Sequence, residues 1–180
     1  MKKALIIIDI QNDYFKGGQM PVVNAEKAAA NAKRILDYFR QKGDVVVHIQ
    51  HVSTRAGATF FLKDSPGVAI HNIVQPVENE VVIEKHYPNA FREAELLSYL
   101  KQKNISDLVV CGMMTHVCVD ATTRAAKDLG FNIELIGDAC ATRDLEVNGA
   151  KVKAGDVQNA FLAALNYYYS DVVDVEAFLK

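Results

Sequence analysis

The chain has 180 residues and a formal net charge of −2, and half of its residues are hydrophobic. This length and composition predict one globular domain, spanning 1–180, with a core large enough to form without disulfides. Because no basic stripe or acidic tail stands out, we expect no nucleic acid and no membrane surface as partner.

The cysteines and the N-terminus indicate the cellular setting. Three cysteines at scattered positions make no disulfide framework, which favours a reducing, cytoplasmic environment. The apolar run after the two N-terminal lysines ends at Asp9 and is too short for a signal peptide. We expect Cys111 and Cys140 to be small core residues.

Apolar runs alternate with amphipathic segments along the whole chain. Strands are expected at 4–8, 45–49, 81–83, 108–111, 133–136 and 170–175. Helices are expected at 24–42, about 92–103, 117–129 and after Gly155, and irregular structure at 50–79 and 139–155. The helix over 24–42 is the clearest, because Gly43 follows it and one face carries Ala28, Ala32, Ile35, Leu36 and Phe39.

This alternation predicts an α/β protein, a Rossmann-like three-layer α/β/α fold with a mostly parallel six-stranded sheet. Folds of this class commonly bind dinucleotides, but the glycine-rich signatures G-x-G-x-x-G and G-x-x-x-x-G-K-[ST] are both absent from the sequence. We therefore expect no nucleotide cofactor.

The stretch 108–129 carries the strongest functional signal. A buried strand stops at Gly112, a short turn follows, and Thr115 is a candidate N-cap for a helix. The expected inward stripe of that helix is Val117, Ala121, Ala125 and Leu129. Cys118 then lies in the first helical turn, where free N–H groups and the helix dipole favour a thiolate and a lowered pKa.

Three reactive side chains fall at the carboxyl ends of expected strands, where open α/β sheets bind ligands. Asp9 follows the first strand, Lys85 the third and Cys118 the fourth. Asp13 or Asp138 could equally supply the carboxylate, and a single lysine is more often solvated. The functional hypothesis therefore depends on the trio coming together.

Several segments resemble a known family over essentially the whole chain. They are IIIDIQNDYF, EKHYPNAF, VVCGMMTHVCVDATTRAAKDLGF and GDACATRD. These segments resemble the isochorismatase-like cysteine hydrolases, which include nicotinamidases and N-carbamoylsarcosine amidases. The G-x-x-T-x-x-C-V-x-x-T pattern at a strand–helix turn is the most specific part of the resemblance.

The resemblance implies an Asp–Lys–Cys triad, here Asp9, Lys85 and Cys118. It also implies a cis peptide between Met113 and Met114, an oxyanion hole formed by the N–H groups of Met114 and Cys118, and a homo-oligomer. In the implied reaction, Asp9 takes the thiol proton while Lys85 stabilises the charges. Cys118 attacks the carbonyl of a small amide or carbamoyl substrate, the C–N bond breaks, and water hydrolyses the thioester.

The same resemblance bears on metal binding. Nicotinamidases hold a metal through an Asp-x-His pair after the second strand, where this chain has Gln50 and Val52. His48 and His51 are the closest histidine pair, but three residues apart on a strand they point to opposite faces. We expect one to be packed and the other to line a pocket, and we expect a metal-independent enzyme.

Aromatic and polar residues near the expected strand ends are candidates for the substrate pocket. The candidates are Phe15, Gln50, Phe60, Phe61, Phe91 and His116. Such walls would suit a small substrate that is partly flat or apolar.

Two other functions remain open at this point. The first is an ether hydrolase of the isochorismate-cleaving type, which would retain its activity after loss of the Cys118 thiol. The second is a non-catalytic thiol redox sensor, which requires an exposed cysteine of low pKa with another thiol nearby.

Overall fold

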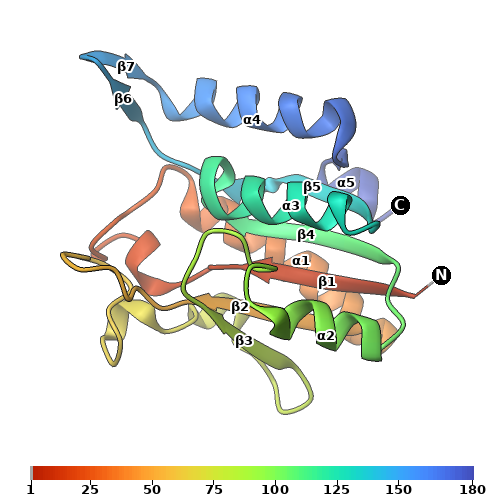
Figure 1. Cartoon of the computed structure of the whole chain (residues 1–180). Coiled ribbons are helices and arrows are strands. Elements are labelled where there is room, and N and C mark those ends of the chain that lie inside the picture. The colour runs from red at the N-terminus through yellow and green to blue at the C-terminus, as the bar shows by residue number, and fades with distance from the viewer. Residues whose placement is uncertain (1) are drawn as a thin grey trace.

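The computed structural model describes residues 2–180 and has one parallel six-stranded sheet at its centre (Figure 1). The sheet has the order β3-β2-β1-β4-β5-β8, and every pairing in it is parallel. Its strands are β1 (Lys3–Ile8), β2 (Val45–His51), β3 (Val81–Lys85), β4 (Asp107–Met113), β5 (Asn132–Ala141) and β8 (Asp171–Val173).

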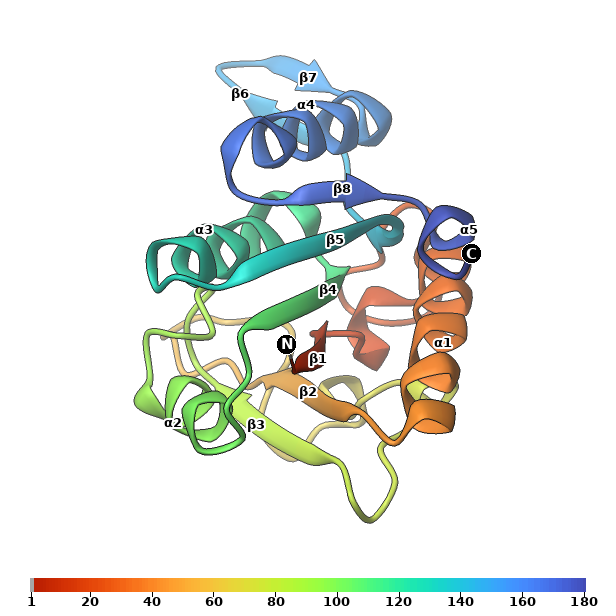
Figure 2. The ribbon, with the colours of Figure 1, turned by 90° about the vertical axis from the view of Figure 1, so that its right-hand side faces the viewer.

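Helices cover both faces of this sheet, which confirms the expected three-layer fold (Figure 2). On one face lie α1 (Ala25–Lys42) and α5 (Val175–Phe178), and on the other lie α2 (Ala94–Gln102) and α3 (Asp120–Asp128). The helix α4 (Ala154–Tyr168) packs beside β8 and α3. Leu5 and Ile7 of β1 face the α1 side, whereas Ala4, Ile6 and Ile8 face the α2 side.

The first helix forms as its sequence pattern predicts. All five residues of its expected apolar face are at most 2% exposed. Gly43 ends it in a left-handed conformation (φ 69°), and the Gly43 N–H donates to the carbonyl oxygens of Arg40 and Phe39. This is the glycine-terminated ending common in helices.

The strand order places a topological switch point at the centre of the sheet. The chain runs from β1 outwards through β2 and β3, and then crosses to the other side of β1 to form β4 and β5. Loops from the two halves therefore part between β1 and β4, and this leaves a crevice at the carboxyl ends of these strands. In Figure 1 these ends lie on the left, where the loops gather.

The stretch expected to be irregular at 139–155 is largely ordered, so that prediction is wrong. The strand β5 continues to Ala141 because it contains a bulge. Leu135 lies opposite Val110 of β4, and pairing resumes with Cys140 opposite Gly112. A hairpin of β6 (Leu145–Val147) and β7 (Ala150–Val152) follows. Its Asn148–Gly149 turn has positive φ angles, which is typical of two-residue hairpins.

The helix that carries Cys118 starts differently from the prediction. A π-helical turn, Thr115–Val119, precedes α3. This wider turn rotates the buried face by one position relative to an ideal helix. Leu129 is therefore 47% exposed, and the buried residues are Cys118, Val119, Thr122, Thr123 and Ala126.

Thr115 does not cap this helix through its side chain, which corrects a second expectation. Its hydroxyl instead lies within donating distance of two acceptors, the carbonyl oxygen of Ala141 (3.1 Å) and Oε1 of Gln158 (2.7 Å). These contacts tie the turn before Cys118 to β5 and α4.

The long segment between β2 and β3 contains two short 3₁₀ turns, Pro66–Val68 and Asn72–Val74, and a third, Asn12–Tyr14, follows β1. Within residues 2–180, no helix is both long and apolar enough to cross a membrane.

Candidate active site

The three predicted catalytic side chains are in direct contact at the carboxyl edge of the sheet. Lys85 Nζ lies 2.8 Å from Asp9 Oδ2 and 3.3 Å from Cys118 Sγ. All three residues are buried, with exposures of 0% for Asp9, 1% for Lys85 and 5% for Cys118. The sheet thus brings together residues that are up to 109 positions apart in sequence (118 − 9).

Asp9 owes its position to the end of β1. Its backbone is left-handed (φ 49°), and its N–H donates to the Ile49 carbonyl, so the chain turns sharply where it leaves the sheet. One carboxylate oxygen, Oδ2, accepts from Lys85. The other, Oδ1, is buried and has no hydrogen-bond partner within residues 2–180. That oxygen is available to receive a proton.

The two alternative carboxylates have structural contacts instead. Asp13 accepts from the backbone N–H groups of Gln19 and Phe61. Asp138 accepts from Asn31 Nδ2 and from the Val175 N–H. Among the three candidates, Asp9 alone lies against Lys85 and Cys118.

Lys85 is the last residue of the edge strand β3, and its side chain reaches the end of β1. Burial disfavours its charged form, but Asp9 and Cys118 outweigh this effect and raise the pKa of Lys85. Its ammonium also lies 2.9 Å from Nδ1 of His51.

The environment of Cys118 corrects the expectation of a lowered pKa. Burial and the neighbouring Asp9 raise the pKa of the Cys118 thiol, whereas Lys85 opposes them. A raised pKa favours the neutral form of this thiol in the resting site. Use of this sulfur as a nucleophile would require a neighbouring group to accept the thiol proton.

The neighbouring ionisable groups are also kept uncharged. Burial, helped by Lys85, lowers the pKa of His51 to about 4, so its ring is neutral near pH 7. Burial, with smaller contributions from Cys118 and Asp9, raises the pKa of Tyr14 well above its usual range. His48, the other member of the histidine pair, is buried and lies 2.9 Å from Glu80 Oε2, away from the site.

One group of atoms near the triad has the chemistry of metal ligands. Asp9, His51 and Cys118 each offer one such atom, and these atoms lie within 4.8 Å of one another. However, the Lys85 ammonium contacts all three residues. A metal ion would have to share this space with a positive charge, so these residues fit the lysine better than a metal.

The backbone before Cys118 has an unusual peptide geometry. The Met113–Met114 peptide bond is cis. The Met114 carbonyl accepts from the N–H groups of Val117 and Val119. Met114 also lines the cavity that contains Cys118.

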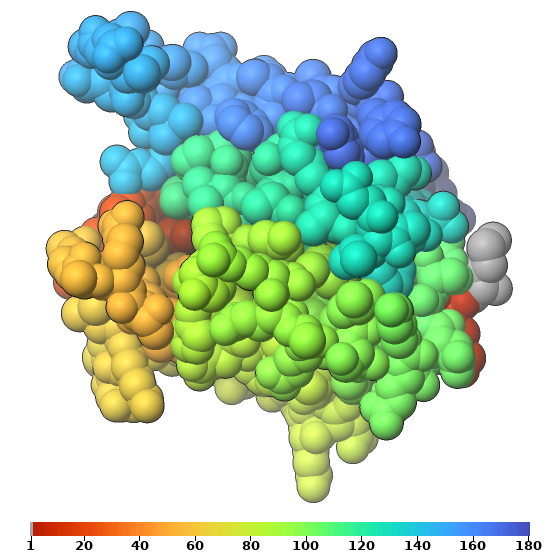
Figure 3. Space-filling model, in the orientation of Figure 1, coloured from red at the N-terminus to blue at the C-terminus, as the bar shows by residue number. Residues whose placement is uncertain are grey.

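That cavity has a volume of about 240 Å³. Its lining residues come from four segments, namely Tyr14; His51, Ser53, Thr54, Arg55, Ala58, Phe60 and Phe61; His86 and Pro88; and Met114, Val117 and Cys118. Figure 3 shows the loop after β2 in orange on the same face as the lime-green segment after β3.

The candidate pocket residues divide into two groups. Phe60 and Phe61 line the cavity. The others lie outside it: Phe15 stacks on His71, Gln50 Nε2 donates to the Val68 carbonyl, Phe91 stacks on Phe131, and His116 Nδ1 lies 2.6 Å from Thr142 Oγ1. Phe15 and His71 line a separate hollow of about 650 Å³.

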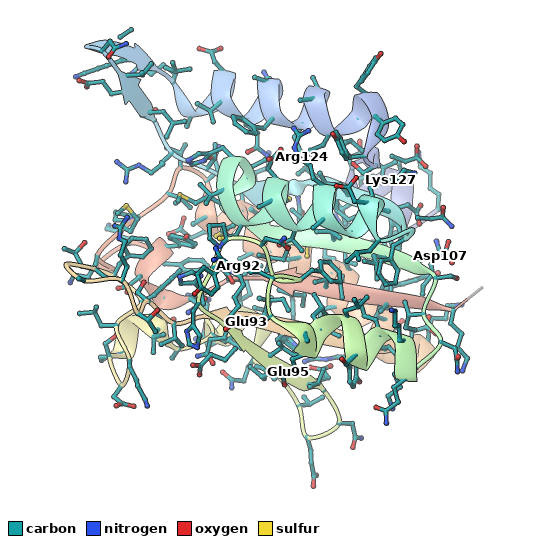
Figure 4. All side chains as sticks on the ribbon, viewed as in Figure 1. Arg92, Glu93, Glu95, Asp107, Arg124 and Lys127 are labelled. Atoms are coloured by element: carbon teal, nitrogen blue, oxygen red, sulfur yellow. The ribbon has the colours of Figure 1, made fainter. Side chains whose placement is uncertain are left out.

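Sequence reasoning missed most of the polar cavity lining. Arg55 lies on a loop without hydrophobic periodicity, so no pattern indicated which of its residues turn inward. His86 is held by its backbone N–H, which donates to Glu93 at the start of α2 (Figure 4). Tyr14 was expected near the site, since it lies within the IIIDIQNDYF segment that contains Asp9.

The fold and site define the class: an α/β protein with a cysteine, a lysine and an aspartate in contact at the carboxyl edge of a parallel sheet. The chain belongs to the isochorismatase family, since the family model named "Isochorismatase domain" matches residues 3–177.

Individual relatives agree with this assignment. The uncharacterised isochorismatase family protein YddQ of Bacillus subtilis is 47% identical over 180 residues, which span all of both chains. A crystal structure of an isochorismatase hydrolase from Oleispira antarctica has a TM-score of 0.95 and 44% identity, covering 99% of this chain and 96% of that one. The nicotinamidase of Escherichia coli is 23% identical over 197 residues and covers 89% of each chain.

Proposed function

We propose that the protein is a metal-independent cysteine hydrolase that cleaves the C–N bond of a small amide or carbamoyl substrate. The observation that carries the proposal is the contact of one buried ammonium, that of Lys85, with both the Asp9 carboxylate and the Cys118 sulfur. The family relationship to a nicotinamidase, an enzyme named for cleaving an amide, supports the same reaction type.

The proposed reaction begins with transfer of the thiol proton to Asp9, whose Oδ1 has no other hydrogen bond within the described chain. The sulfur attacks the substrate carbonyl, and Lys85 balances the negative charge that forms. The N–H groups of Met114 and Cys118 bind the resulting oxyanion, and each donor of this kind lowers the barrier by about 3–4 kcal/mol.

Collapse of this intermediate breaks the C–N bond. The proton held by Asp9 goes to the leaving nitrogen, and the acyl group stays on Cys118 as a thioester. Water then attacks the thioester, Asp9 accepts the proton of that water, and the acid is released with the thiol restored.

The test is release of ammonia or amine from a panel of small primary amides and carbamoyl compounds. We expect Cys118→Ala to lower turnover by at least about 10³-fold, because the nucleophile is lost. Cys140→Ala, which removes a buried thiol outside the cavity, is the matched control. Full turnover by Cys118→Ala would contradict the thioester mechanism.

The redox-sensor alternative fits the site less well. Cys118 is only 5% exposed, and burial raises rather than lowers its pKa. A thiol in this state reacts slowly with oxidants unless a base first removes its proton.

A further inference from the structure

The cavity beside Cys118 has an unequal distribution of charge. Its lining includes no Asp and no Glu, and Arg55 is the one lining side chain with a permanent charge. The side chain of Arg55 takes part in none of the ion pairs formed within residues 2–180. The guanidinium is thus free to bind a ligand.

No carboxylate among the cavity-lining residues pairs with Arg55, although Glu93 accepts from the His86 N–H behind this lining. The Asp9 carboxylate beneath the cavity is already paired with Lys85, so these two charges offset each other. His51 and Tyr14 are held neutral by burial. Among the lining side chains, Arg55 therefore carries the positive charge that an entering ligand meets, and this side chain is exposed at the cavity mouth.

The remaining walls define the rest of the ligand. Phe60, Phe61, Pro88 and Val117 supply apolar surface, and the volume of about 240 Å³ admits only a small molecule. Such a molecule would place its reacting carbonyl at Cys118, its apolar part between the rings and an anionic group at Arg55.

We propose that the substrate is a small amide that also carries a carboxylate, and that Arg55 binds this carboxylate. The inference rests on the proposed function, because it assigns the substrate class of the same site. The planar guanidinium offers two parallel N–H donors that match a carboxylate, a geometry that a lysine at this position could not supply.

A matched pair of alkylating reagents tests the proposal without knowledge of the natural substrate. Iodoacetamide and iodoacetate differ only in the group beside the reacting carbon, which is a neutral amide in one and a carboxylate in the other. In both reactions the Cys118 S–C bond forms, the C–I bond breaks, iodide leaves, and the thiol proton passes to Asp9 or solvent. The measured quantity is the iodoacetate-to-iodoacetamide rate ratio at Cys118, located by mass spectrometry and divided by the same ratio for glutathione in the mixture.

We expect this normalised ratio to exceed one in the unmodified protein and to fall about 3- to 10-fold in Arg55→Gln, with the loss falling on iodoacetate. Arg55→Lys should give an intermediate value, because the charge remains but the paired donors are lost. Lys63→Gln is the matched control, since it removes a positive charge from the same exposed loop outside the cavity lining. Added salt should lower the ratio in the unmodified protein but not in Arg55→Gln.

Each other outcome overturns the proposal in a distinguishable way. An unchanged ratio in Arg55→Gln, with Cys118 still labelled by both reagents, would remove Arg55 from substrate binding and leave the proposed function standing. An equal fall in both rates would show that Arg55 acts on the loop structure and not on the carboxylate. If neither reagent labels the Cys118 of the unmodified protein, the proposed function fails, and this inference fails with it.

Discussion

Lys85 is the residue on which the electrostatics of the site depend. Its ammonium is buried, yet it contacts a carboxylate oxygen, a ring nitrogen and a sulfur within 3.3 Å. A buried charge is tolerated only with such partners, because leaving water costs several kcal/mol for each ion. Removing one charge of the pair therefore has a larger effect than removing both.

This asymmetry gives the first prediction at the residue scale. Lys85→Met should lower the free energy of unfolding by about 3–5 kcal/mol, because Asp9 is left buried without its partner. The double variant Asp9→Asn with Lys85→Met should be more stable than Lys85→Met alone. Urea denaturation at pH 7 measures both differences.

Lys33→Met is the control for loss of a lysine, since Lys33 forms an exposed pair with Asp37 four residues away. Its effect should stay within about 0.5 kcal/mol. If Lys85→Met and Lys33→Met lowered the free energy of unfolding equally, the buried Asp9–Lys85 pair would contribute no more than an exposed one.

Much of the triad could be predicted at this scale, and little of the pocket could. Asp9, Lys85 and Cys118 each end or follow an apolar run, and parallel strands bring such ends to one edge. The raised pKa of Cys118 could not be foreseen, because burial depends on what packs over the helix end. Arg55 and Ser53 line the cavity because of the path that their loop takes, and the sequence of this loop has no hydrophobic periodicity that would predict it.

At the element scale, the close approach of β1 and β4 matters most for the site. Gly112 of β4 has φ 134°, and a Cβ atom there would lie 2.0 Å from the carbonyl oxygen of Ile8. Ile8 directly precedes Asp9, so this glycine sets the distance between the two strands that carry Asp9 and Cys118.

We therefore predict that Gly112→Ala destabilises the fold by roughly 3 kcal/mol or more, because backbone atoms and not a flexible side chain must move. Gly130→Ala is the matched control, since Gly130 also has a positive φ of 92° but open space around its Cβ position. The control should lose only about 1 kcal/mol. Thermal unfolding followed by circular dichroism would separate the two, and similar losses would refute the steric argument.

A second element-scale feature joins α1, β2 and the segment before β3. Glu80 accepts from Arg40 and the Val77 N–H and lies 2.9 Å from His48 Nε2. Burial alone would raise the pKa of Glu80, but the hydrogen bonds outweigh it and lower this pKa from its ordinary 4.5 to about 2. Because the folded pKa is the lower one, ionised Glu80 stabilises the fold above about pH 4.5. That stabilisation is lost as the pH falls towards 2.

Glu80→Gln should accordingly lower stability at pH 7 by about 1–3 kcal/mol and flatten the loss of stability between pH 4.5 and pH 2. Glu78→Gln, an exposed change in the same segment, should do neither. Urea midpoints measured across this pH range decide the matter. If Glu80→Gln lost stability between pH 4.5 and pH 2 as steeply as the unmodified protein, this result would contradict the lowered pKa of Glu80.

The elements themselves were predictable where one period ran undisturbed. The apolar face of α1 repeats regularly over 18 residues, and its prediction is confirmed. The helix after β4 was misread because its π turn adds a residue, and β5 was cut short because a bulge breaks its register. Both irregularities follow from tertiary packing near the site, which a local pattern does not contain.

At the scale of the whole molecule, the packing of α4 completes the second face. Arg124 of α3, labelled in Figure 4, forms an ion pair with Asp120 and lies 4.4 Å from the ring of Tyr169 at the end of α4. The outer side of α4 remains open, with Tyr167 91% exposed and Tyr168 65% exposed.

The homo-oligomer implied by the family resemblance stays a prediction at this scale. Light scattering after size-exclusion chromatography should give a mass that is a multiple of 19.9 kDa, and two or more copies are expected. A concentration-independent mass of one chain would contradict the expectation.

The central place of β1 has a consequence for how the protein is made. β1 pairs with β2 and β4, and it leaves the ribosome about 100 residues before β4. Synthesis proceeds at roughly 5–20 residues per second, so the edge of β1 that pairs with β4 has no partner for about 5–20 s. During this interval the nascent chain exposes an unpaired, hydrophobic strand edge, which is the kind of segment that chaperones bind and that aggregates without them.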